Sequence, residues 1–266
     1  MARSLLLQQS LGNPPLASSY ALYESETSVA QYCDAHYGPD KLGVANFPAH
    51  LAHLCASAML GKPKRSALDL GCAAGRASFE LATCFDQVTG IDFSSRFIDI
   101  SRRLKERGRI GYRLIEEGDL ISDHGVYLAD FGLEATAPKV NFYQGNAERL
   151  EINDHCHDLV LVANLIDRLS KPGKFLSGIH RLLVVGGLLV IASPYNWLDN
   201  FTPRQQWLGG RFRFGNPITS LTGLTKKLSN HFDAVGEPQD VAFVIRKTSR
   251  TFQHNISQVT FWRRVS

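Results

Sequence analysis

An acidic residue and two glycines stand where a short apolar run gives way to a helical stretch. The segment reads ALDLGCAAGRASFEL from Ala67, with Asp69 in the apolar run and Gly71 and Gly75 after it. A strand, a glycine turn and a helix N-terminus in this order are typical of nucleotide-type sites. The spacing is D-x-G-x-x-x-G, whereas dinucleotide sites read G-x-G-x-x-G. Because Asp69 would repel a nearby phosphate in a partly dehydrated site, the sequence disfavours a pyrophosphate ligand.

The charge of Asp69 favours S-adenosylmethionine, which has no phosphate and carries a sulfonium cation and an ammonium group. We expect the helix N-terminus at residues 75–77, with Arg76, to face the methionyl carboxylate. Asp92 closes the second strand and is placed to accept both ribose hydroxyls. A glycine turn alone is weak evidence, but fitting polar groups at four successive strand ends are harder to obtain by chance. Asn146 and Ala147 are expected beside the adenine, and Asn164 near the sulfonium. Further cofactor contacts are expected from Cys72, Phe93 and Tyr37.

These residues need a sheet whose strand ends meet at one edge. Strands are expected at 66–70, 87–91, 140–144, 159–163, 188–192, 232–237 and 258–264, and helices at 75–84, 94–107, 170–185 and 221–230. Alternation of this kind implies a parallel sheet covered on both faces. We therefore predict an α/β, Rossmann-like class I methyltransferase fold, with a seven-stranded, mostly parallel sheet whose last strand is antiparallel.

Two parts of the chain depart from that alternation. Residues 1–60 are expected to form a loose arm and then a helical lid over the cofactor, with breaks at Gly38-Pro39 and Phe47-Pro48. Residues 61–266 would form the methyltransferase domain. The stretch from Gly111 to Leu133 is expected to be an inserted hairpin or an irregular excursion.

The composition limits the function classes. No apolar run is long enough to span a bilayer, and Leu5 to Leu7 is too short for a signal peptide. The five scattered cysteines fit reduced thiols in a cytoplasmic protein. The net charge of +4 comes from dispersed residues, so no nucleic-acid partner is expected. The run DHCHD at 154–158 precedes a strand at the edge opposite the cofactor, and we interpret it as a surface turn without a metal.

Several longer stretches are more specific than the glycine turn. They read YESETSVAQYCDAHYG, ANFP, TGIDFSSRFI, VANLIDRL, GGLLVIASPYNWLDNFTPRQQWLGG and FVIRKTSRTFQHNISQVTFWRR, and with the glycine turn they span nearly the whole chain from about Tyr20. In these stretches the sequence resembles the C-terminal methyltransferase domain of the bifunctional ovothiol-biosynthesis proteins, the 4-mercaptohistidine N1-methyltransferase family. The upstream iron-dependent sulfoxide-synthase domain of that family is missing. We expect a stand-alone enzyme or an excised domain, with a separate sulfoxide synthase and lyase in the pathway.

The resemblance implies methyl transfer from S-adenosylmethionine to an imidazole nitrogen (N1) of 5-thiohistidine, giving ovothiol A and S-adenosylhomocysteine. Topology independently supports a small-molecule site, because the segments 164–169, 193–214 and 243–255 all leave the sheet at the cofactor edge. They offer an aromatic wall and a few charged groups, which suit a zwitterionic heteroaromatic amino acid. The expected substrate-binding residues are Asn164, Arg168, Trp197, Phe201, Arg204, Trp207, Phe252 and Gln253.

In-line methyl transfer depends mainly on positioning. A neutral imidazole nitrogen already has a lone pair, so the site needs to fix the tautomer and needs no strong base. Asp167 is the first candidate to hold the proton on the ring nitrogen that is not methylated. His254 and Asn164 are the next candidates for this role. Because the substrate sulfur is the stronger nucleophile, a donor such as an arginine or Tyr195 is expected to hold it away from the methyl group.

Three alternatives remain at this stage. The acceptor could be another small imidazole or amine, such as histidine. The chain could be a methyltransferase-like binding subunit without turnover, since Ala73 stands where many relatives carry glycine, although Asp69, Gly71 and Asp92 are intact. A nucleic-acid methyltransferase is favoured only by the mild positive charge.

Overall fold

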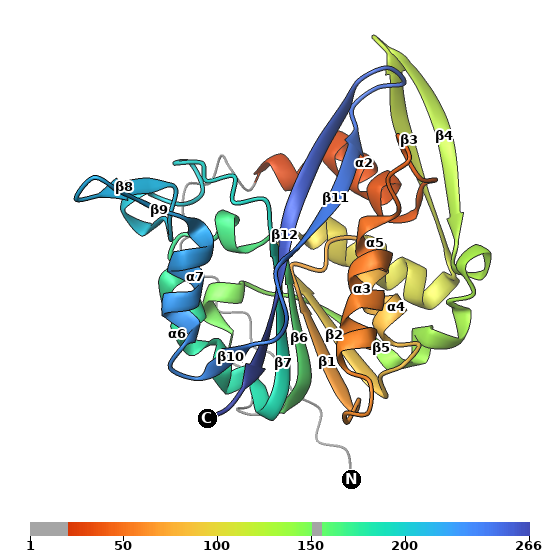
Figure 1. Ribbon diagram of the computed structural model, residues 1–266. Coiled ribbons are helices and arrows are strands. Elements are labelled where there is room, and N and C mark those ends of the chain that lie inside the picture. The colour runs from red at the N-terminus through yellow and green to blue at the C-terminus, as the bar shows by residue number, and fades with distance from the viewer. Residues whose placement is uncertain (1–20, 151–155) are drawn as a thin grey trace.

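A twisted, mostly parallel sheet forms the centre of the molecule (Figure 1). The structure is a computed structural model and describes residues 21–150 and 156–266. The strand order is β10-β12-β7-β6-β1-β2-β5, β12 is antiparallel to β7 and β10, and the remaining pairs are parallel. The predicted sheet is therefore confirmed, and β11 adds an eighth strand by pairing with β12. The strands are β1 (Ser66–Leu70), β2 (Gln87–Asp92), β5 (Val140–Gln144), β6 (His157–Ala163), β7 (Leu183–Ser193), β10 (Phe232–Ala234), β11 (Gln239–Arg246) and β12 (Phe252–Arg264).

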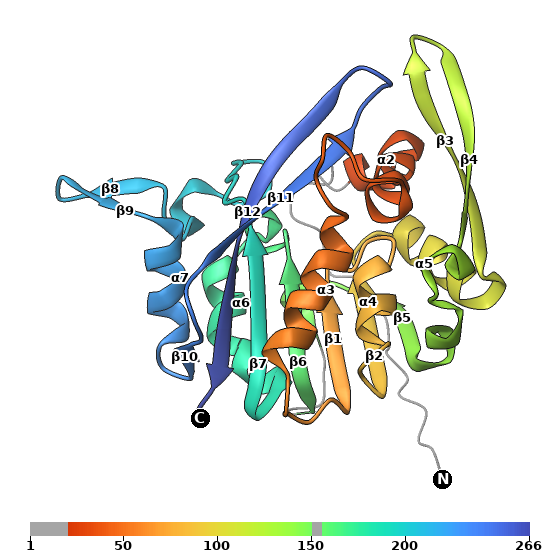
Figure 2. The ribbon, with the colours of Figure 1, turned by 45° about the vertical axis from the view of Figure 1, so that its right-hand side comes forward.

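Helices cover both faces of this sheet (Figure 2). Helices α3 (Phe47–Ala58), α4 (Arg76–Leu81) and α5 (Ser95–Arg107) lie on one face, and α6 (Pro172–Gly178) and α7 (Ser220–Leu228) lie on the other. Successive residues of a strand point to opposite faces. In β6, Leu159 and Leu161 join the first core cluster, and Val160 and Val162 join the second. Burial on both faces explains why β6 reads as an unbroken apolar run.

Two hairpins project from the core. The predicted excursion after α5 is the hairpin of β3 (Arg109–Glu117) and β4 (Leu120–Tyr127), which turns at Gly118 with a φ of +56°. A second, shorter hairpin of β8 (Arg211–Arg213) and β9 (Asn216–Ile218) was not predicted. In the first, Ile110, Tyr112 and Leu114 of β3 are buried or partly buried and alternate with exposed residues, so this strand carries a two-residue period.

Some predicted boundaries are wrong. Residues 243–255 were expected to leave the sheet, but most of them form a ribbon. In this ribbon β11 and the first half of β12 pair over Gln239–Arg246 and Phe252–Val259, with residues 247–251 as the turn. The ribbon is stabilised by pairing between its two strands, which the sequence of either strand alone does not reveal. The helix expected over 170–185 ends at Gly178, and a short 3-10 turn leads directly into β7. Gly186 is not a helix stop but lies within β7 with a φ of +82°, where the register against β6 shifts.

The N-terminal helices pack at the top of the sheet. A short turn (Leu22–Glu24) leads into α2 (Glu26–Tyr37), which packs against β11 and β3. The side chains of Ser25 and Asn46 cap α2 and α3 by accepting from the backbone N–H groups of Ser28 and Ala49. Residues such as Leu51 in α3 belong to the same core cluster as β1, so the boundary expected near residue 60 does not separate two cores. The arm expected over residues 1–19 lies outside the described residues.

The glycine turn gives a direct test of this packing. Gly75 has a φ of +82°, and a Cβ there would lie 2.8 Å from the ring of Phe142. We expect Gly75→Ala to lower the free energy of unfolding by about 2 kcal/mol, because the left-handed backbone and the close approach both penalise a side chain. Gly178→Ala is the control, since its φ is −103° and nothing lies within 4 Å of the position that the added methyl group would take. Denaturant unfolding of both variants is the measurement, and equal midpoints would contradict the expectation.

Candidate active site

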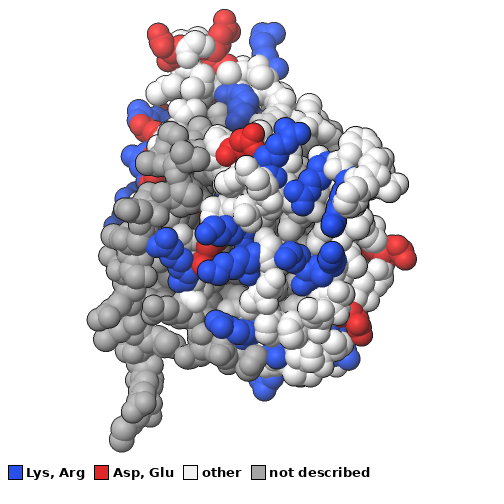
Figure 3. All heavy atoms as spheres, turned by 90° about the vertical axis from the view of Figure 1, so that its left-hand side faces the viewer, with Lys and Arg blue, Asp and Glu red and all other residues white. Residues whose placement is uncertain are grey.

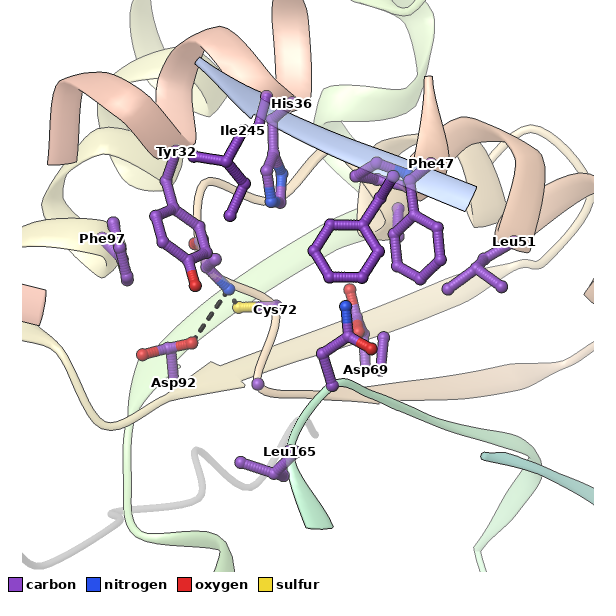
Figure 4. Close-up of a pocket in the computed structure, with 18 of the residues that line it drawn as sticks. Tyr32, His36, Phe47, Leu51, Asp69, Cys72, Asp92, Phe97, Leu165 and Ile245 are labelled. Atoms are coloured by element: carbon purple, nitrogen blue, oxygen red, sulfur yellow. Dashed lines mark hydrogen bonds between the residues drawn. The ribbon is translucent and has the colours of Figure 1, made fainter. Parts of the chain in front are cut away.

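A cavity opens at the carboxyl ends of β1, β2 and β6 (Figure 4). The strand ends form its floor, α2, α3 and the turn between them cover it, and residues 243–245 of β11 close one side. Side chains from segments far apart in the sequence therefore face one space. Nine of the residues predicted from the sequence line it: Asp69, Gly71, Cys72, Asp92, Phe93, Asn146, Ala147, Asn164 and Arg168.

The glycine turn is folded by the end of the neighbouring strand. The backbone N–H of Gly71, where φ is +78°, donates to the carbonyl oxygen of Ile91 over 2.8 Å. Ala73 takes a φ of +43° without being a glycine, and its N–H donates to Oδ2 of Asp92 over 2.9 Å. The turn thus depends on Asp92 for one of its backbone hydrogen bonds, and this contact offsets part of the strain at Ala73.

Asp92 is held by two backbone donors. Besides Ala73, the N–H of Ser94 donates to its Oδ1 over 2.9 Å. Each carboxylate oxygen keeps a further lone pair, so the group can still accept two hydroxyl hydrogens. Burial raises the pKa of Asp92 to about 6, although the backbone donors oppose this shift. Such a carboxylate suits the two ribose hydroxyls of an adenosine.

Asp69 is the second acid at the floor of the cavity. Its side chain is 1% exposed and accepts from Oγ of Ser78 over 2.7 Å. Burial raises the pKa of Asp69 to about 7, and the charge of Asp92 adds to the shift. A buried carboxylate at Asp69 and a half-buried one at Asp92, near the ends of adjacent strands, favour a ligand that brings positive charge. The sulfonium and ammonium groups of S-adenosylmethionine supply that charge, so the residues present fit this cofactor.

Asn164 lies where β6 ends. It has a φ of +52°, and its N–H donates to the carbonyl oxygen of Ala192 over 2.8 Å. This backbone geometry turns its side chain into the cavity, where Oδ1 accepts from Oγ of Ser257 over 2.6 Å. The amide therefore occupies a fixed position between β6 and β12.

Three expected cofactor residues lie behind the cavity wall. Gly75 and Tyr37 shape the turn, since the Tyr37 hydroxyl donates to the carbonyl oxygen of Ala74 over 2.8 Å. The Arg76 guanidinium lies 3.9 Å from the ring centroid of Phe131 and pairs with Glu80 at 2.7 Å. The prediction that Arg76 faces the methionyl carboxylate is therefore wrong, because the inserted segment after β4 and the i,i+4 acid hold its charge elsewhere.

The predicted catalytic residues are not brought together. Asp167 is fully buried and accepts from Nη1 of Arg168 over 3.0 Å and from the N–H of Asn196 over 3.1 Å. The Tyr195 hydroxyl donates to Oε1 of Gln258, and His254 is exposed on β12. None of the three lines the cavity among the described residues. Asp167 instead orients Arg168, which does line it.

Most of the predicted aromatic wall supports the site from outside. Its side chains hold the loop after β7 in place. The Trp197 indole N–H donates to Oγ of Ser220, and the Trp207 indole N–H donates to the carbonyl oxygen of Thr202, both over 2.8 Å. Phe201 lies 5.1 Å below the Arg168 guanidinium. The residues that were expected to bind substrate but do not line the described cavity are Trp197, Phe201, Arg204, Trp207, Phe252 and Gln253.

Three cavity residues on α2 were not predicted from the sequence: Tyr32, Ala35 and His36. Tyr32 and His36 face the cavity one helical turn apart, with Ala35 between them (Figure 4). Tyr32 packs against Phe97 with ring centroids 5.0 Å apart. The i, i+3, i+4 spacing of residues 32, 35 and 36 was the available signal, since it marks one face of a helix.

The basic side chains gather elsewhere. Exposed lysines and arginines lie over α6, α7 and the β8–β9 hairpin (Figure 3), and none of them lines the described cavity: Lys171, Lys174, Arg181, Arg211, Arg213, Lys226 and Lys227. From the run DHCHD, His157 contacts Oγ of Ser66 at 2.8 Å and Asp158 pairs with Arg65 at 2.8 Å. Asp154 and His155 lie outside the described residues. Within 21–150 and 156–266, every helix is too short or too polar to cross a bilayer.

Comparisons with known proteins agree with this geometry. Residues 68–191, from β1 to β7, match the sequence model of a family described as a methyltransferase domain. The protein is an S-adenosylmethionine-dependent methyltransferase. No curated protein sequence matches the chain.

Solved structures show the class I fold of this methyltransferase. The 4+2 cyclase SpnF has a TM-score of 0.59 at 15% identity, with 95% of this chain and 97% of that chain covered. A structure concerned with the conversion of a disulfide bond into a thioacetal group during echinomycin biosynthesis has a TM-score of 0.52 at 17% identity, with 81% of each chain covered. A methyltransferase from Methanosarcina mazei has a TM-score of 0.50 at 18% identity, with 79% of this chain and 97% of that chain covered.

The raised acid pKa values predict how donor binding depends on pH. A cation favours the ionised carboxylates, so affinity for S-adenosylmethionine should be highest above about pH 7 and fall as pH drops through the pKa values of about 7 at Asp69 and about 6 at Asp92. Binding near pH 6.5 should release protons, which calorimetry in buffers of different ionisation enthalpy detects. S-adenosylhomocysteine, which lacks the sulfonium charge, should show a weaker pH dependence. An affinity independent of pH would contradict the acid assignments.

Replacement of Asp92 tests the ribose contact. Asp92→Asn keeps the side-chain shape but exchanges one charged acceptor for a donor, so we expect S-adenosylmethionine to bind at least about tenfold more weakly. Asp86→Asn is the matched control, because Asp86 is exposed just before the opposite end of the same strand. Calorimetric titration measures both variants, and wild-type affinity in Asp92→Asn would refute the ribose assignment.

Proposed function

We propose that this methyltransferase transfers the methyl group to an imidazole nitrogen (N1) of 5-thiohistidine and so forms ovothiol A. The supporting observation joins sequence and geometry. Two stretches that resemble the ovothiol-biosynthesis family, residues 162–169 and 243–264, supply cavity residues beside the acidic floor: Ala163, Asn164, Leu165, Arg168, Leu169, Phe243, Val244 and Ile245. A small planar acceptor fits between such an apolar wall and a few fixed polar groups.

The proposed chemistry is an in-line displacement. Bound S-adenosylmethionine supplies an electrophilic methyl group on a sulfonium centre. The chain then has to align a nitrogen lone pair with that bond, and a neutral imidazole provides the lone pair without a strong base. Of the three tautomer-holding candidates, only Asn164 lines the cavity, and its Oδ1 retains a second lone pair beside the Ser257 bond. We therefore assign to Asn164 the acceptor role for the far ring N–H.

The acceptor sulfur must be kept from reacting. Tyr195 donates to Gln258 outside the cavity, so the remaining candidate is Arg168. Its guanidinium is fixed by Asp167 and its Nε lies 3.3 Å from the Tyr23 hydroxyl. A fixed cation next to the acceptor space would attract a thiolate and hold it away from the methyl group.

Residues 21–60, the described part of the expected lid, are proposed to cover the site. Tyr23, Phe47 and the turn between α2 and α3 cover the cavity, and the Tyr37 hydroxyl ties α2 to the glycine turn. A covered site excludes water from the reacting atoms. The five cysteines are free thiols, which fits the cytoplasm as the proposed compartment.

The identity of the acceptor is tested by comparing three possible substrates. The enzyme is incubated with S-adenosylmethionine and separately with 5-thiohistidine, histidine and RNA, and the methyl group is located by mass spectrometry. We expect one methyl group on the imidazole nitrogen of 5-thiohistidine, and at least about tenfold less product from histidine, which lacks the sulfur that Arg168 would hold. A methyl group on sulfur, a preference for histidine, or no product with any acceptor would refute the proposal.

A further inference from the structure

His36 projects from α2 into the top of the cavity (Figure 4). The ring is 9% exposed, and its Nδ1 accepts from the backbone N–H of Arg76 over 3.4 Å. An imidazole whose Nδ1 accepts carries its proton on Nε2 when it is neutral. Burial, and to a smaller extent the Arg76 charge, lowers the pKa of His36 to about 3, so the ring stays neutral at physiological pH. The His36 ring therefore presents an N–H donor to the cavity and no basic nitrogen.

Two other polar side chains at the top of the cavity are engaged within the protein. Lys41 is engaged by Asp34, at 3.1 Å, and by the carbonyl oxygen of Pro39. Asn46 donates to the carbonyl oxygens of Ala35 and His36 while it caps α3. The Arg76 guanidinium pairs with Glu80, and although its Nη1 is buried without a partner, Arg76 does not line the described cavity. Nε2 of His36 makes no hydrogen bond within the described part of the chain, so it is available to a ligand in the cavity.

We propose that His36 donates a hydrogen bond from Nε2 to the α-carboxylate of an amino-acid group bound in the cavity. Two bound molecules carry that group: the methyl donor, through its methionyl end, and the amino-acid acceptor, where the inference rests on the proposed function. His36 adjoins the N-terminus of α4 through Arg76, beside the glycine turn. The same tautomer protects the enzyme, because a protonated Nε2 has no lone pair with which to attack the methyl donor.

Two substitutions separate this role from a structural one. His36→Asn places an amide oxygen near the Nδ1 position, so it can still accept from Arg76 but loses the cavity donor. His36→Gln places an amide N–H near the Nε2 position and keeps that donor. His53→Asn on α3 is the control, because its side chain is 75% exposed. Each variant is titrated with S-adenosylhomocysteine and with 5′-methylthioadenosine, which lacks the amino-acid end, and the acceptor KM is measured.

If His36 binds the methyl donor, His36→Asn should weaken S-adenosylhomocysteine at least about tenfold and leave 5′-methylthioadenosine unchanged. If it binds the acceptor, only the acceptor KM should rise by that factor, at unchanged kcat. In either case His36→Gln should remain within about threefold of wild type. The two-ligand comparison needs no acceptor, so it stands or falls independently of the proposed function.

The opposite pattern overturns the inference. His36→Asn equal to wild type in all three measurements would mean that the ring only caps Arg76. Equal losses for 5′-methylthioadenosine and S-adenosylhomocysteine in both variants would mean a general disturbance of the lid. Nitrogen-15 NMR of the wild-type enzyme should show the neutral Nε2–H form of His36, and a proton on Nδ1 would equally contradict the assignment.

Discussion

The contact that the site depends on is the Asp92 carboxylate between two backbone N–H groups. One belongs to Ala73 in the glycine turn and the other to Ser94 at the start of α5, both 2.9 Å away. A single side chain therefore joins the end of β2, the turn after β1 and the next helix. The same contact fixes an anion at the cavity floor, and burial of Asp69 on the adjacent strand adds a second acid. The electrostatic preference for a cationic methyl donor follows from the way the turn is built.

The part of the site above this floor comes from elements that the parallel sheet does not specify. Helix α2 is held between β11 and the β3–β4 hairpin, and it brings Tyr32 and His36 over the strand ends. The β11–β12 ribbon brings Phe243, Val244 and Ile245 to the same space. The strands of the class I fold thus supply the acidic floor of the cavity, and the additions to the fold supply its covering walls. This division explains how relatives of the same fold, such as the cyclase SpnF, carry other chemistry.

The sequence was sufficient for the residues that follow strand ends. Asp69, Asp92 and Asn164 reach the cavity because the carboxyl ends of parallel strands must share one edge. It was not sufficient where a side chain's direction depends on a tertiary neighbour. Arg76 turns toward Glu80 and Phe131, and the latter belongs to an insertion whose packing has no local signal. His254 fails for a different reason, since the side chains of a strand alternate in direction and its register was not known.

The acids Asp69 and Asp92 at the head of the sheet favour a positively charged donor over a phosphorylated cofactor. The most direct measurement is calorimetric titration of the purified protein with S-adenosylmethionine and with NAD at the same concentration, above about pH 7, where Asp69 is ionised. Saturable binding of S-adenosylmethionine and no heat from the dinucleotide are expected. Binding of the dinucleotide at this turn, or no binding of S-adenosylmethionine, would contradict this preference.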